Sequence, residues 1–158
     1  MQHFKIELKW ALLFIGMTWV WMIGEKLVGL HDAYIAQHPT YTNLVAIPAI
    51  IWYVLAMREK RNQFFEGKMT YKQGVVFGLI MTGFITILVP ISQLVISNII
   101  TPDYFENAIE YSVSSGQATQ EEADSFFNIK SYILQGMIGA PIMGIITTLI
   151  VAIFVKKR

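Results

Sequence analysis

The sequence predicts an all-α fold, a bundle of four helices that cross a membrane. The 158-residue chain is 54% hydrophobic and only 15% charged, whereas soluble domains carry about 25% charged residues. Four segments are apolar over lengths close to the roughly 20 residues that a helix needs to cross about 30 Å of hydrocarbon. They cover residues 10–29, 41–57, 74–100 and 131–155. The chain length favours one integral membrane domain over residues 1–158.

The first segment is expected to be a retained membrane helix, with a cleaved signal peptide as the alternative. Trp19, Trp21 and Met22 stand where small residues precede a cleavage site, and no A-x-A pattern follows them. The third segment begins at a capping box formed by Thr70 and Gln73. Its length over residues 74–100 allows it to tilt in the membrane.

Basic residues alternate with the membrane segments and predict their orientation. Ten of the twelve Lys and Arg residues lie in the amino-terminal tail, in the loop after the second segment and at the carboxyl terminus. The two remaining connections hold only Lys26 and Lys130. Because Lys and Arg are enriched in cytoplasmic loops, both termini are predicted to be cytoplasmic. The connection between the third and fourth segments is then outside.

That connection, residues 101–130, is predicted to be an extracytoplasmic amphipathic helical hairpin. Thr101 followed by Pro102 is typical of a helix start, and Thr119 with Glu122 forms a capping box for a second helix. The second helix is expected to continue unbroken into the fourth membrane segment. Six of the 11 acidic residues lie here. They lack the loop signature of a calcium site, so a solvated acidic face is favoured over a metal site.

Small residues recur every fourth position in two of the membrane segments. Such residues let helices approach closely in lipid, which predicts a tight antiparallel pair. A bias toward glycine in membrane helices is the alternative explanation. The predicted packing ridges consist of Gly74, Gly78, Thr82 and Thr86 in the third segment and of Gly136, Ala140, Gly144 and Thr148 in the fourth.

Polar residues near the predicted outer ends of the helices are the candidates for a functional site. Ionisable groups inside membrane segments are costly and are functional candidates by default. Glu25 is the clearest of them. The alternative is structural, because Glu25 can pair locally while Asn and Gln bridge helices by hydrogen bonds. The candidate outward-facing polar pocket comprises Glu25, His31, Asn43, Gln93, Asn98 and Gln135.

Catalysis and metal binding have little support in the sequence. There is no cysteine, and the motifs G-x-S-x-G, H-E-x-x-H and the P-loop are missing from the sequence. The three histidines look scattered, with His3 predicted on the opposite side of the membrane from His31 and His38. No metal site and no cofactor is therefore predicted. Enzyme activity is left open. A membrane enzyme that acts on lipid, with Glu25 and His31 as an acid–base pair, has the weakest support of the functions considered.

Several stretches resemble a known bacterial family. They are YTNLVAIPAIIWYVLAMREKR (41–61), GKMTYKQG (67–74), TPDYFENAIEY (101–111) and TQEEADSFFNIKSY (119–132). In this order they resemble domain-of-unknown-function family 4199, a family of small multi-pass membrane proteins. The resemblance implies four membrane helices and a bacterial inner (cytoplasmic) membrane. It implies no catalytic residue.

Two functions are weighed from the sequence. The first is a non-enzymatic membrane component that acts through lipids or partners, including a second copy of the chain or another membrane protein. The alternative is a small homo-oligomeric transporter or channel-like subunit that uses the outward-facing polar pocket. Nucleic acid is not expected as a partner, because the basic residues flank membrane segments.

Overall fold

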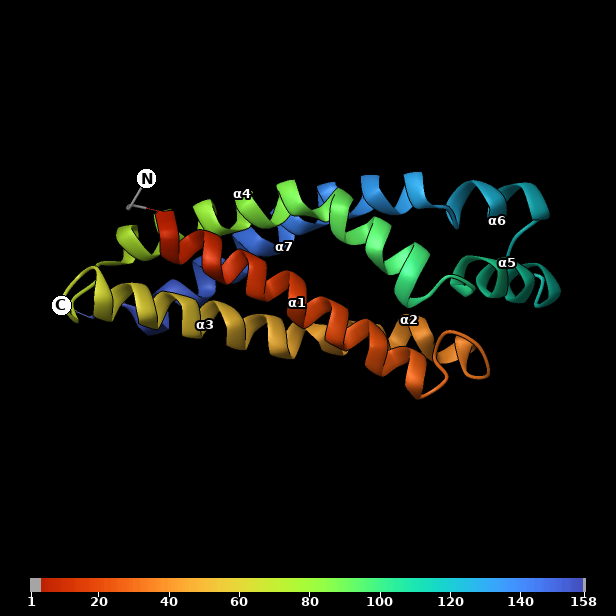
Figure 1. The fold of residues 1–158 in the computed structure, drawn as a ribbon, viewed down its shortest axis with the longest axis horizontal. Coiled ribbons are helices and arrows are strands. Elements are labelled where there is room, and N and C mark those ends of the chain that lie inside the picture. Colours follow the sequence, from red (N-terminus) through yellow and green to blue (C-terminus); the bar gives the residue numbers. More distant parts are fainter. Residues whose placement is uncertain (1–3, 158) are drawn as a thin grey trace.

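The fold is all-α, and the computed structural model describes residues 4–157. Four long apolar helical segments run side by side in an elongated bundle (Figure 1). Each is long and apolar enough to cross a membrane, which confirms the four predicted spans. Their bounds are Lys5–Leu27, Ile35–Gln63, Tyr71–Ile100 and Ile129–Val155.

The first two spans begin before their predicted first residues. Helix α1 (Lys5–Leu27) begins five residues earlier than expected. The second span is a series of short helices, η2 (Ile35–Gln37), α2 (His38–Tyr41) and η3 (Thr42–Val45), followed by α3 (Ala46–Gln63). Two of the charged residues at the end of α3, Glu59 and Lys60, contact side chains of α1.

The third span and the second helix of the hairpin begin at capped residues. Thr70 and Gln73 form the predicted capping box of α4 (Tyr71–Val95), which continues as the π-helix η4 (Ile96–Ile100). Thr119 and Glu122 form the predicted box of α6 (Gln120–Phe126). The Thr119 backbone N–H donates to the Glu122 carboxylate and lowers the pKa of that exposed side chain.

Two details of the predicted hairpin are wrong. Helix α5 (Tyr104–Ser114) begins at Tyr104, after a turn at Pro102. The second hairpin helix also does not run unbroken into the fourth span, because α6 ends at Phe126 and α7 (Ile129–Val155) begins at Ile129. Asn128 accounts for the break, since its side chain accepts the Ser131 N–H and starts a new helix.

The most extensive helix pair is α4 with α7. A Cβ atom placed on Gly78 would clash with Thr148, and one on Gly144 would clash with Thr82. Thr82 also shares a hydrogen bond of 2.8 Å with the Tyr53 hydroxyl of α3. Glycine at these two positions therefore permits the close approach of the helices. Gly74 meets Ala152 in the same interface, with 3.2 Å between a Cβ on Gly74 and the Ala152 Cβ.

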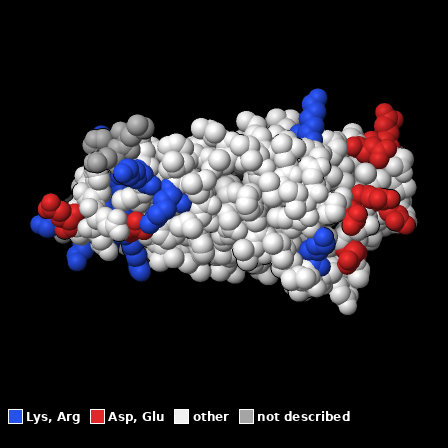
Figure 2. Space-filling model, viewed as in Figure 1, with Lys and Arg blue, Asp and Glu red and all other residues white. Residues whose placement is uncertain are grey.

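The opposite ends of the bundle differ in charge. Lys and Arg side chains gather at the end that holds both termini of the described chain, and acidic side chains gather around α5 and α6 (Figure 2). At the basic end, Lys60 contacts Glu7 at 2.9 Å, and both side chains are buried. Lys9 contacts Glu59 at 2.5 Å nearer the surface. These pairs join α1 to the end of α3.

Candidate functional site

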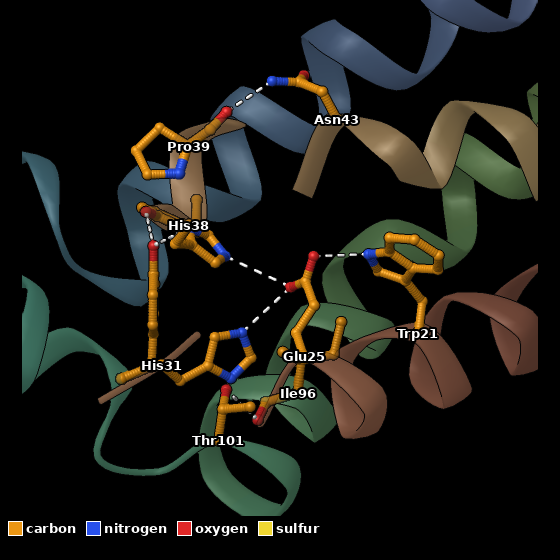
Figure 3. A network of polar contacts seen from close by, with 10 residues as sticks. Trp21, Glu25, His31, His38, Pro39, Asn43, Ile96 and Thr101 are labelled. Carbon is orange, nitrogen blue, oxygen red and sulfur yellow. Dashed lines mark hydrogen bonds and ion pairs between the residues drawn. The ribbon is translucent and has the colours of Figure 1, made fainter. Parts of the chain in front are cut away.

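Glu25, near the end of α1, is the centre of a buried polar cluster at the acidic end of the bundle (Figure 3). The Trp21 indole N–H donates to its Oε1 atom at 2.6 Å. His31 Nε2 lies 3.1 Å and His38 Nε2 3.4 Å from its other oxygen, Oε2. A carboxylate that is only 3% exposed is thus surrounded by three nitrogen-containing rings.

A tight loop after α1 brings His31 back over Glu25. Gly29 adopts a φ of +80°, which favours glycine, and its carbonyl accepts the Tyr34 N–H at 2.7 Å. The Leu30 N–H donates to the carbonyl of Glu25. The Asn107 side chain of α5 donates to the His31 carbonyl at 2.9 Å, so the α5–α6 hairpin also holds this loop.

Aromatic side chains from the hairpin and α7 cover the cluster. The Tyr104 hydroxyl lies 3.4 Å from His38 Nδ1 and 3.1 Å from the Tyr132 hydroxyl. The Tyr104 ring also packs against His31, with 5.2 Å between ring centroids. Burial, Tyr132 and the negative charge of Glu25 raise the pKa of Tyr104 well above its usual range. Tyr104 is therefore a neutral hydroxyl at physiological pH.

The structure brings together only two of the six residues of the candidate polar pocket, Glu25 and His31. Asn43 is exposed and donates to the Pro39 carbonyl. Gln93 donates to Ser97, Asn98 to the Leu94 carbonyl, and Gln135 to Ser131. Each of these four amides bonds to its own helical segment and not to Glu25.

His38 was not among the candidate residues, and the view of the histidines as scattered is wrong for His31 and His38. Ligand atoms of Glu25, His31 and His38 all lie within 4.8 Å of one another. The seven-residue separation of the two histidines matches no regular motif, because a glycine turn and short helices join them. The sequence carried only a weaker signal: two histidines in a short connection that follows a Glu near the end of an apolar segment.

A second feature is an apolar groove between α3 and α7. Phe14 of α1 and Ile85 of α4 also line it, and its volume is about 460 Å³. Small residues leave this space: Ala46 and Ala49 on α3, and Ala140 and Gly144 on α7. Two of these, Ala140 and Gly144, belong to the predicted packing ridge of α7. This ridge therefore contacts α4 and also lines the α3–α7 groove.

The four candidate spans indicate a multi-pass membrane protein. Residues 9–157 match the family model described as "Protein of unknown function (DUF4199)", and the chain belongs to this family. Searches of curated proteins and of solved structures find no match.

Proposed function

We propose that this DUF4199 protein is a non-enzymatic component of the bacterial inner membrane that binds a lipid acyl chain in the α3–α7 groove. Both termini lie in the cytoplasm, and the α5–α6 hairpin lies outside. The basic residues support this orientation, since they gather at the end that holds both termini of the described chain (Figures 1 and 2). The groove is the observation that carries the proposed lipid binding.

The position of the groove selects an acyl chain as its occupant. Its α7 lining runs from Ala140 to Val151, within the Ile129–Val155 span. A helix rises about 16 Å over that distance, roughly half of a 30 Å hydrocarbon layer. At this depth the surroundings are lipid chains and other membrane segments. The polar groups at the groove are few, namely Asn43, Tyr53 and Thr147.

The size and the lining of the groove also fit this occupant. Ligand sites commonly enclose about 300–1,000 Å³ and are lined mainly by apolar side chains. A groove of about 460 Å³ lies in that range. The transporter alternative has less support, because four of the six candidate pocket residues bond within their own segments, away from Glu25.

Native mass spectrometry of protein extracted with its lipids tests the proposal. We expect the parent protein to retain about one phospholipid per chain after loosely bound lipid is stripped. Ala140→Phe fills the groove and is expected to abolish that retained mass. Ile138→Phe is the matched control, because Ile138 is an exposed α7 residue outside the groove lining.

Three outcomes contradict the proposed occupant. Equal lipid retention in Ala140→Phe and the parent would place the lipid elsewhere. A parent that retains no lipid would leave the groove without this ligand. A parent dimer that is lost only in Ala140→Phe would identify a second copy of the chain as the occupant.

A further inference from the structure

We propose that Glu25, His31 and His38 bind a divalent first-row transition metal ion of the Zn²⁺ type. This site is separate from the α3–α7 groove and does not depend on lipid binding there. The three ligand atoms come from the end of α1, the loop after it and the first turn of α2 (Figure 3). Metal binding would therefore tie together three consecutive segments beneath the outer hairpin.

The spacing of the ligand atoms fits a small metal ion. Bonds of about 2.0–2.1 Å to a tetrahedral zinc ion separate neighbouring ligand atoms by about 3.3–3.4 Å. Glu25 Oε2 lies 3.1 Å from His31 Nε2 and 3.4 Å from His38 Nε2. Small side-chain adjustments are enough to admit an ion between the three atoms, because all three lie within 4.8 Å of one another.

The ligand types indicate which ions bind. Two imidazoles and one carboxylate suit zinc and its neighbours in the first transition series. Calcium and magnesium prefer sites made entirely of oxygen ligands. The Glu25 carboxylate offsets one of the two positive charges, and the imidazoles bind as neutral groups, so binding releases any proton held at the ligand atoms.

Two of the three proposed ligands, Glu25 and His38, have a partner that could serve as the outer shell of a metal site. Ligating groups usually form a second hydrogen bond that fixes their orientation. Trp21 donates to Glu25 Oε1 and leaves Oε2 facing the histidines. The Tyr104 hydroxyl lies beside His38 Nδ1, on the ring edge away from Glu25. His31 Nδ1 is buried and has no hydrogen-bond partner within residues 4–157.

A small cavity on the hairpin side borders the cluster at His38. His38 and Tyr104 line a cavity of about 70 Å³ between the α2 region and α5. Glu25 and His31 lie deeper, at 3% and 4% exposure. Three protein ligands leave the fourth tetrahedral position for water or another small ligand.

Zinc binding by the purified full-length protein tests the proposal. The probe is Zn²⁺ alone, equilibrated by dialysis at a series of concentrations with metal-stripped protein in detergent, and the bound zinc is measured by elemental analysis. We expect one zinc ion per chain, and at least about tenfold weaker binding for each of Glu25→Gln, His31→Gln and His38→Gln. Asp32→Asn is the control, because Asp32 is an exposed acid in the same loop. Trp21→Phe, which removes an outer-shell donor, is expected to weaken binding about 10–100-fold.

X-ray absorption by the zinc-loaded parent keeps the test independent of variant folding. We expect two imidazole ligands and only nitrogen or oxygen atoms in the first shell. Zinc bound equally by the parent and the three ligand variants would overturn the proposal, as would a parent that binds none. A first shell without two imidazoles would do the same. Loss of lipid retention in Ala140→Phe with zinc binding intact would show that the groove and the metal site are separate.

Discussion

Replacing Lys60 by methionine is expected to lower the free energy of unfolding by about 3–5 kcal/mol, because the change leaves Glu7 as an unpaired buried charge. The two side chains contact at 2.9 Å and are 6% and 2% exposed. Methionine has about the same volume as lysine, so the decrease in the free energy of unfolding reports mainly the missing charge. For a chain of this size the change corresponds to a melting temperature roughly 6–20 °C lower, measured by thermal scanning in detergent.

Two further variants test whether the loss of stability in Lys60→Met comes from the unpaired charge of Glu7. Lys9→Met breaks the more exposed contact with Glu59 and is expected to cost about 0–1 kcal/mol. The double variant Glu7→Gln, Lys60→Met removes both charges and is expected to recover part of the lost stability. Equal melting temperatures for Lys60→Met and Lys9→Met would show that the Glu7–Lys60 pair does not stabilise the bundle.

Replacing Gly78 by leucine is expected to separate α4 from α7. Even a Cβ atom at this position would clash with Thr148 and approach Met57 Cε to 2.9 Å. Overpacking of this kind costs about 1–3 kcal/mol, which lowers the melting temperature by roughly 2–12 °C. Thermal scanning in detergent measures this change in melting temperature.

The control for Gly78 lies on the same helix. Gly83 is exposed, and a Cβ atom there would meet nothing within 4 Å. Gly83→Leu is therefore expected to melt within about 1–2 °C of the parent, as surface substitutions change stability by about 0.5 kcal/mol or less. If Gly78→Leu melts like Gly83→Leu, the close packing of α4 on α7 is not a source of stability.

Local patterns in the sequence were sufficient to predict the spans and two helix starts. A membrane helix needs a continuous run of apolar residues. Such a run can be recognised in the sequence without knowing which helices pack beside it. The capping boxes at Thr70 and Thr119 satisfy backbone groups three residues away, so they too are visible locally. The start of α7 depends on the Asn128 cap, a local signal that the expectation of a continuous helix overlooked.

Contacts between distant segments were not predictable in the same way. Glu7 and Lys60 are both charges at span ends, and only the packing of α1 against α3 pairs them. His38 reaches Glu25 because the Gly29 turn and the short helices η2 and α2 reverse the chain. Those segments have no regular hydrophobic period, so the sequence pattern could not place His38 beside His31.

The orientation of the chain is the central claim, because it decides which side of the membrane the Glu25 cluster and the acidic hairpin face. A phosphatase reporter that is active only outside the cytoplasm tests it most directly. Fused after Gly116, in the turn between α5 and α6, the reporter is predicted to be active. Fused after Asn62, near the end of α3, it is predicted to be silent. Activity after Asn62 with silence after Gly116, from fusions present in equal amounts, would contradict the account.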